Sequence, residues 1–179
     1  MKIIKPLMLV GLLGILAYLT LSKQGKLLAL SIGGGIMNIS DKGIAFISNF
    51  EGFSDKPYND PPGSRKWSIG YGHQILPGEI LTSVTRDQAA TLLAKDTAIA
   101  NAAITENITV PLTQAQHYAL VSFVYNVGVY AFKSGSVPSR INSGNFSDAA
   151  ATMKKYIYAG GSVNQALVER RKSEASAFA

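Results

Sequence analysis

Two carboxylates and a hydroxyl lie close enough along the chain to serve one proton-transfer site. Glu51 and Asp60 fall within EGFSDKPYND, and Ser68 follows in WSIGYGH. Glu51 comes after Ile44 and Ile47 at helical spacing, so a helix places it at the end of an apolar stripe. Apolar surroundings disfavour a charged carboxylate, and a carboxyl that keeps its proton near neutral pH can act as a general acid. A solvated glutamate at a helix end fits the same spacing, so both interpretations stay open.

The element that must carry Glu51 is a helix over DKGIAFISNFEG. Ser40 is its expected N-cap, and Asp41 in the first turn interacts favourably with the helix dipole. Gly52 is its expected end. These signals predict a helix that holds the glutamate in its last turn.

A β-hairpin should carry the other two groups. Residues 56–60 and 67–72 have the composition of strands, and PPGSRK between them is typical of a turn. Asp60 stands at the bend, where an aspartate commonly bonds its own backbone. No His or Lys is spaced to activate Ser68 as a nucleophile, so we assign its hydroxyl a hydrogen bond rather than an attack.

The second strand of this hairpin has one bulky face and one nearly bare face. Trp67, Ile69 and Tyr71 alternate along it with Ser68, Gly70 and Gly72. Because successive side chains of a strand point to opposite faces, one face carries a hydroxyl and two missing side chains. We expect a shallow trough there, in which an extended substrate can approach the backbone closely.

Taken in order, these motifs resemble the phage-type lysozymes of glycoside hydrolase family 24, the endolysins that open bacterial peptidoglycan. The likeness runs from Ser40 to the end of the chain, through EGF, SIGYGH, FVYNVGVYAFKSGSVPSRINSGNF and LVERRKSE. Two features depart from the family pattern. The family usually has threonine in place of Ser68, and its turn between Asp60 and that position is shorter.

The resemblance implies a hydrolase of the β-1,4 glycosidic bonds between N-acetylmuramic acid and N-acetylglucosamine, acting in host cell lysis at the end of phage infection. It implies that Glu51 is the catalytic acid, that Asp60 orients or activates water, and that Ser68 holds this water. Glycoside hydrolysis requires two such carboxyls, whose separation sets the stereochemistry, and the family favours inversion.

Four further residues are expected to contact the glycan strand: Gly70, Tyr71, Gly72 and Asn126. Asn126 could equally cap a neighbouring helix. No cofactor or metal is expected, because the chain has no cysteine and only two histidines.

Beyond the hairpin the chain reads as a helical lobe. The expected helices cover residues 85–104, 113–127, 147–156 and 164–178, with Thr85, Thr113 and Ser147 as N-caps. We expect His73 to make structural hydrogen bonds, His117 to be partly exposed, and Arg170 and Arg171 to lie at the surface or pair between helices. The fold class is therefore α+β and lysozyme-like, with a small lobe of helix and antiparallel hairpin, a larger helical lobe, and a cleft between them.

Residues 1–39 read as a separate segment before a catalytic domain over residues 40–179. Lysines precede an uncharged apolar run over residues 6–22. As a helix this run would span roughly 25 Å, which is less than the ~30 Å hydrocarbon layer of a membrane. Three consecutive glycines at 33–35 indicate a flexible joint.

Three interpretations of this segment stay open: a cleaved signal peptide, a permanent anchor, and an anchor that can leave the membrane. Residues 29–31, Ala-Leu-Ser, offer small residues for cleavage. The glycine-diluted run resembles the signal-anchor-release segments of some phage endolysins. That resemblance implies attachment to the host inner membrane through residues 6–22, with the N-terminus cytoplasmic, and later release to the periplasm.

The formal net charge of +6 favours encounter with a polyanion. We expect a monomer that binds peptidoglycan, whose peptides carry carboxylates, rather than nucleic acid, because no basic stripe is interleaved with aromatic residues. Other functions stay open: a lytic transglycosylase that uses Glu51 alone, a noncatalytic glycan-binding module, and a membrane-active basic helix at the C-terminus.

Overall fold

The computed structural model describes residues 7–10, 16–21, 27–30, 37–59, 63 and 65–179. Near the N-terminus three short strands, β1 (Leu7–Val10), β2 (Leu16–Leu21) and β3 (Leu27–Leu30), pair antiparallel in that order. The apolar helix predicted over residues 6–22 lies partly outside the described ranges, and the joint predicted at residues 33–35 lies wholly outside them. Both therefore stay predictions. Within these ranges no helix is both long and apolar enough to cross a membrane.

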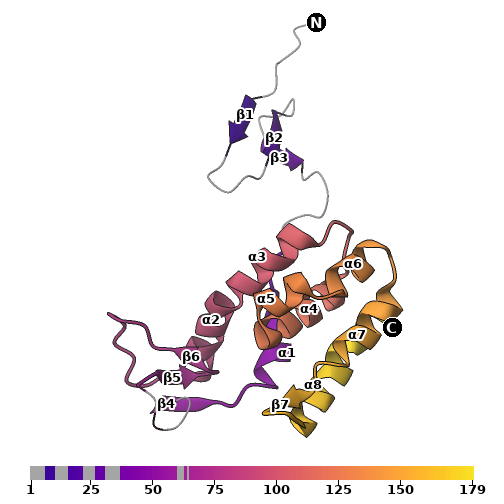
Figure 1. Cartoon of the computed structure of the whole chain (residues 1–179). Coiled ribbons are helices and arrows are strands. Elements are labelled where there is room, and N and C mark those ends of the chain that lie inside the picture. The colour runs from indigo at the N-terminus through magenta and orange to yellow at the C-terminus, as the bar shows by residue number, and fades with distance from the viewer. Residues whose placement is uncertain (1–6, 11–15, 22–26, 31–36, 60–62, 64) are drawn as a thin grey trace, which may run out of the picture.

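The small lobe consists of one helix and a three-stranded sheet (Figure 1). Helix α1 (Asp41–Ser48) begins as predicted at Ser40, whose hydroxyl accepts a hydrogen bond from the Gly43 amide at 3.3 Å. Strands β4 (Ser54–Asn59) and β5 (Trp67–Gly70) form the predicted hairpin, and β6 (His73–Gln74) extends the sheet in the order β4-β5-β6. The predicted hairpin is confirmed, with β5 as the central strand.

The helical lobe contains seven helices and a second small hairpin within residues 86–176, all of which are described. The helices are α2 (Arg86–Asp96), α3 (Ala98–Asn107), α4 (Gln114–Val127), α5 (Val129–Ser134), α6 (Val137–Asn142), α7 (Phe146–Met153) and α8 (Gln165–Ser176). The hairpin is β7 (Tyr158–Ala159) with β8 (Ser162–Val163). The predicted α+β architecture, with a small lobe of helix and antiparallel hairpin and a larger helical lobe, is confirmed.

Helix α4 lies at the centre of the core, where it packs against α1, α3 and α8 (Figure 1). The sequence predicts a core stripe of Leu120, Phe123, Val124 and Val127 on this helix; the first three are buried and Val127 is half-buried. His117 on the same helix is also buried, at 2% exposed, so the expectation of partial exposure was wrong. Helix α3 covers this side of α4, and His117 Nε2 lies 2.7 Å from Asn101 Oδ1 of α3.

Two helices of the larger lobe begin at the N-cap residues that the sequence predicted. Thr85 and Thr113 cap α2 and α4, each with a glutamine three residues later that completes a capping box. The helix predicted over 85–104 is instead two helices divided at Thr97. Helix α7 begins after Asn145 rather than at Ser147, an earlier start than predicted.

His73 on β6 joins the sheet to helix α2, as predicted for a structural hydrogen-bonder. Its Nδ1 lies 2.9 Å from Asp96 Oδ1, and its Nε2 lies 3.0 Å from Glu79 Oε2. Burial by itself would lower the pKa of His73, but hydrogen bonds to Glu79 and Asp96 outweigh burial and raise it above its ordinary 6.5. The protonated imidazole therefore holds two carboxylates from two segments.

Replacing His73 by glutamine should cost more stability in mild acid than in base. Because the pKa is raised in the folded state, the stabilisation is complete below about pH 6.5 and is lost as the pH rises through the folded value. Thermal unfolding should show a larger difference in melting temperature between wild type and His73→Gln at about pH 5.5 than at about pH 9. A difference that stays constant with pH would contradict the role of the charged imidazole.

Candidate active site

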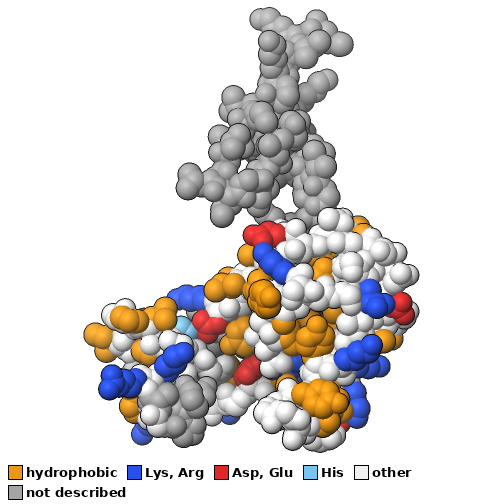
Figure 2. Space-filling view, in the orientation of Figure 1, with side chains coloured by type: hydrophobic (Ala, Val, Ile, Leu, Met, Phe, Trp, Pro, Cys, Tyr) orange, Lys and Arg blue, Asp and Glu red, His pale blue; other side chains and the backbone are white. Residues whose placement is uncertain are grey.

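Glu51 lies in the turn that follows helix α1 and lines a large pocket. The helix ends at Ser48, earlier than the predicted Gly52, so Glu51 is not in its last turn. Its side chain is 24% exposed at the edge of a pocket of about 910 Å³. Figure 2 shows this face of the molecule hollowed between the sheet lobe and the C-terminal helices. The pocket also includes Phe50, Asn126, Lys155, Tyr156, Tyr158, Asn164, Leu167, Glu169 and Arg170.

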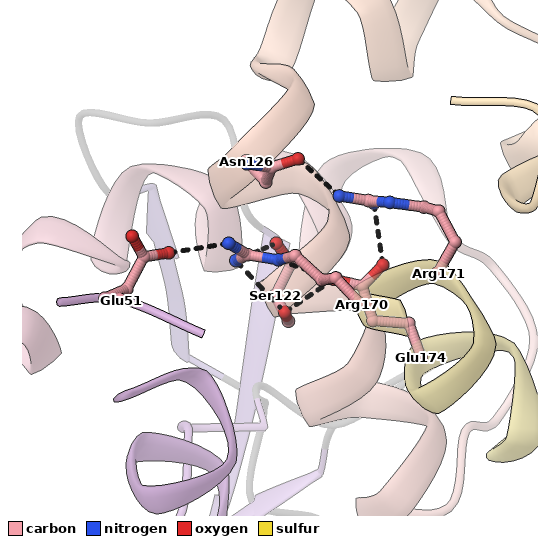
Figure 3. Close-up of polar contacts among 6 residues, drawn as sticks. All are labelled: Glu51, Ser122, Asn126, Arg170, Arg171 and Glu174. Carbon is pink, nitrogen blue, oxygen red and sulfur yellow. Dashed lines mark hydrogen bonds and ion pairs between the residues drawn. The ribbon is translucent and has the colours of Figure 1, made fainter. Parts of the chain in front are cut away.

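The partner of Glu51 is a guanidinium and not the apolar stripe that the sequence predicted. Arg170 Nη1 of α8 donates to Glu51 Oε1 at 2.7 Å (Figure 3). Because the glutamate lies beyond the helix, it leaves the stripe of Ile44 and Ile47 and faces α8 instead. Among the described residues Glu51 Oε2 has no hydrogen-bond partner, so one carboxyl oxygen is held and the other is available to a bound molecule.

Arg170 is itself fixed by contacts with α4 and with its own helix. It is 3% exposed, and its Nε donates to Glu174 Oε1 at 3.1 Å. Its Nη2 donates to the Ser122 carbonyl at 3.1 Å and to the Ser122 hydroxyl at 3.2 Å. The Ser122 hydroxyl donates to Glu174 Oε1 at 2.6 Å. This network sets the position of the guanidinium, and through it the position of Glu51 (Figure 3).

A second buried arginine on α8 holds Asn126. Arg171 Nη2 donates to Asn126 Oδ1, and Arg171 Nη1 lies 2.6 Å from Glu174 Oε2 (Figure 3). The latter contact is an ion pair without an aligned hydrogen bond, since both atoms lack a hydrogen-bond partner by geometry. Burial lowers the pKa of Arg171 to about 10. The side-chain carbonyl of Asn126 thus accepts a hydrogen bond from α8, and Asn126 also lines the pocket.

Glu174 is the fully buried counter-ion of both arginines. It is 0% exposed and lies between Arg170 and Arg171. Burial raises the pKa of Glu174, although both guanidiniums and the Ser122 hydroxyl act in the opposite direction. The expectation that Arg170 and Arg171 pair between helices is confirmed, and the alternative of a surface position was wrong.

The pKa of Tyr125 on α4 is affected by burial and by the charge of Glu51. Burial, followed by the nearby charge of Glu51, raises the pKa of Tyr125 to about 12. The phenol therefore stays protonated well above neutral pH.

The bare face of β5 is not the open trough that the alternation predicted. A Cβ on Gly70 would lie 2.8 Å from the Ala89 Cβ of α2, and Gly70 has φ +66°. The glycine is needed because the helix packs directly on the strand, so no substrate can approach the backbone at Gly70. Ser68 is also buried, at 4% exposed, and pairs with Tyr58 on one side and Gln74 on the other.

The other predicted contacts at this strand lie away from the Glu51 pocket. Tyr71 packs on Phe53, with ring centroids 5.4 Å apart, and lines a separate pocket beside α1 and α2. Gly72 has φ +87° in the tight turn between β5 and β6. Neither residue lines the pocket that contains Glu51. Asp60 lies outside the described residues.

The β7–β8 hairpin was missed at the sequence level, although it forms one wall of the pocket. Gly160 and Gly161 stand between its strands with φ +57° and +81°. Two glycines between short strands are a recognised signal for a two-residue turn with positive φ, so YAGGSV could have revealed it. Arg170 gave a weaker signal, because its partner Glu51 is 119 residues away.

The sequence and the fold of this chain are similar to those of known phage proteins. The phage lysozyme family model matches residues 48–174. The endolysin of Bacillus phage B103 is 38% identical over 142 residues, which cover 79% of this chain and 54% of that protein. The chain thus spans about half the length of the Bacillus phage relatives that it matches.

Two further relatives are covered over most of their length. The SAR-endolysin of Enterobacteria phage PA-2 is 32% identical over 152 residues, covering 83% of this chain and 91% of that protein. A crystal structure of a P22 lysozyme mutant superposes with a TM-score of 0.72 at 31% identity, covering 79% of this chain and 98% of that structure. Because the family model matches well over half of the sequence and the solved fold agrees, this chain belongs to the phage lysozyme family.

Proposed function

We propose that this protein is an endolysin that hydrolyses the β-1,4 bonds between N-acetylmuramic acid and N-acetylglucosamine in bacterial peptidoglycan. The observation that carries the proposal is the carboxyl of Glu51, which is held by Arg170 through one oxygen and stands in a pocket with the other. A general acid must be fixed in direction yet reach the leaving oxygen of its substrate. The Arg170 contact supports the first requirement, and the pocket supports the second.

The proposed mechanism uses two carboxyl groups. Glu51 protonates the glycosidic oxygen as its bond to the anomeric carbon breaks, and Asp60 accepts a proton from the water that attacks that carbon. Ser68 contributes a hydrogen bond that holds this water. Water attacks from the face opposite the leaving group, so the product has inverted configuration.

Substitution at the second carboxyl should separate hydrolysis from transglycosylation. Asp60→Asn should lower the rate severely, because an amide does not accept the proton of the attacking water, whereas Ser68→Thr keeps the hydroxyl and should stay active. The measurement is the loss of turbidity of outer-membrane-permeabilised cells. A fully active Asp60→Asn variant would favour a lytic transglycosylase, in which Glu51 alone closes the muramyl 6-hydroxyl on the anomeric carbon.

Mass analysis of the released fragments tests the reaction directly. Hydrolysis adds one water and leaves a reducing end, whereas transglycosylation leaves an anhydro-muramyl end that is lighter by one water. Reducing ends without anhydro sugar are the expected result for the wild-type chain. Absence of any released fragment would contradict both enzyme reactions and favour a noncatalytic glycan-binding module.

The N-terminal segment is proposed to work as a signal-anchor that holds the protein at the inner membrane and later releases it to the periplasm. Two observations support this: the apolar run of residues 6–22 between lysines, and the relatives named SAR-endolysins. Glycines within the run weaken its insertion, so the segment can leave the bilayer when the membrane potential collapses.

Strengthening the apolar run should delay release. Replacing Gly11 and Gly14 together by leucine should make membrane insertion more favourable by roughly 1 kcal/mol for each change. The double variant should stay in the membrane fraction after depolarisation and lyse cells late, as fractionation and culture turbidity would show. Lysis on the wild-type schedule, or a mature N-terminus near Ser31, would contradict release.

A further inference from the structure

The wall of the Glu51 pocket formed by the β7–β8 hairpin has the features of a glycan-contacting surface. Lys155, Tyr156 and Tyr158 line the same pocket as Glu51, and they come from the hairpin or the turn before it. The hairpin is closed by its two-glycine turn and by the Asn164 amide, which donates to the Ile157 carbonyl at 2.8 Å. These contacts hold the backbone of the hairpin in place at the pocket.

Tyr158 presents an uncovered aromatic ring at this wall. It is 64% exposed, whereas its neighbour Tyr156 packs edge-on against Phe123 with ring centroids 5.1 Å apart. An exposed large aromatic side chain leaves apolar area in water that a ligand can cover. One face of a pyranose ring carries mainly C–H groups, and it matches a flat aromatic ring in both polarity and size.

Lys155 adds a positive charge at the same wall. The other charged residues of the pocket are already paired: Arg170 with Glu51, and Glu169 with Lys172 at 2.8 Å. Among the described residues, no carboxylate lies within ion-pair distance of Lys155. The stem peptides of peptidoglycan carry carboxylates on every muramyl unit, so this ammonium has a natural counter-ion in the substrate.

We infer that the β7–β8 hairpin is a substrate subsite in which Tyr158 stacks on a sugar ring and Lys155 pairs with a carboxylate of the attached stem peptide. The inference rests on the proposed peptidoglycan hydrolysis and assigns its substrate preference. The ring supplies affinity for the glycan strand, and the ammonium discriminates peptide-bearing strands from neutral glycan.

The tyrosine is tested by the rate of release of dye-labelled fragments from purified sacculi at low substrate concentration, which reports kcat/KM. Tyr158→Ala should lower kcat/KM about tenfold, the loss expected when an aromatic contact is removed. Tyr158→Phe should retain the wild-type value, since stacking uses the ring and not the hydroxyl. Tyr130→Ala is the matched control, because Tyr130 is 86% exposed on α5 and does not line the pocket.

The lysine is tested with two forms of the same sacculi, one native and one whose carboxylates have been converted to neutral amides. Lys155→Gln should lower kcat/KM about threefold on native sacculi at low salt, as for an exposed ion pair, and less at high salt. On amidated sacculi the variant should equal the wild type. Lys154→Gln is the matched control, since Lys154 is exposed and outside the pocket.

The outcomes separate this inference from the proposed function. If wild-type protein releases no fragments from either form of sacculi, the proposed hydrolysis is wrong. If wild type is active but Tyr158→Ala matches Tyr130→Ala, the stacking role is wrong and the hydrolysis stands. A Lys155→Gln defect of equal size on native and amidated sacculi would overturn the ion pair with the stem peptide.

Discussion

Glu51→Gln should remove nearly all lytic activity while the protein stays folded. The amide cannot donate a proton to the leaving oxygen, and loss of general acid catalysis lowers rates by roughly 10²- to 10⁴-fold. Its carbonyl oxygen can still accept the hydrogen bond from Arg170 Nη1, so the network of α8 and α4 remains in place. Turbidity clearance of permeabilised cells measures the activity, and thermal unfolding checks the fold.

The matched control for this variant is Glu169→Gln. Glu169 lines the same pocket, but its carboxylate is exposed and paired with Lys172 at the surface of α8. This variant should clear cells at close to the wild-type rate. Clearance by Glu51→Gln that matched the control would show that the pocket carboxyl is not the acid, and the enzyme hypothesis would fail.

Glu174→Ala should destabilise the fold by about 3–5 kcal/mol, the cost of removing one partner from a buried group of charges. Arg170 and Arg171 are 3% and 0% exposed, and both lie against Glu174. Without the carboxylate two buried guanidiniums lose their shared counter-ion, and the Ser122 hydroxyl loses its acceptor. Urea unfolding followed by circular dichroism measures the free energy of unfolding.

Glu169→Ala on the same helix provides the reference for this measurement. Its carboxylate is exposed and its ion pair with Lys172 lies in water, so its removal should change the free energy of unfolding far less than the removal of Glu174. Activity gives a second readout. At a temperature where Glu174→Ala is still folded, kcat should fall because Arg170 no longer holds Glu51 in place. A variant as stable and as active as Glu169→Ala would contradict the role of the network.

The features that were predicted correctly from the sequence are those whose interacting groups lie within a few residues of each other. The caps at Ser40, Thr85 and Thr113 were all predicted and found. A cap is a hydrogen bond between a side chain and a backbone amide three residues later, so its partners are both visible in one short stretch. The β4–β5 hairpin was predicted for the same reason, since its strands adjoin their turn.

Expectations about exposure failed where a distant element covers the residue. His117 is polar and was expected to be partly exposed, but α3 provides Asn101 for its Nε2. Gly70 was expected to leave room for substrate, and it leaves room for Ala89 of α2 instead. A missing side chain has the same local signature whether a ligand or a helix occupies the space, so the sequence could not separate the two.

The sequence by itself determined that Glu51 is a candidate acid, that a hairpin follows it, and that the domain is lysozyme-like. Only the tertiary structure decided what surrounds the carboxyl. Arg170 reaches Glu51 from 119 residues away, and it is oriented there by Ser122 of α4 and Glu174 of α8. A buried charge is tolerated when oppositely charged and hydrogen-bonding partners surround it in good geometry. Here those partners come from several elements, so their positions depend on how the helices pack and not on the sequence neighbours of any one residue.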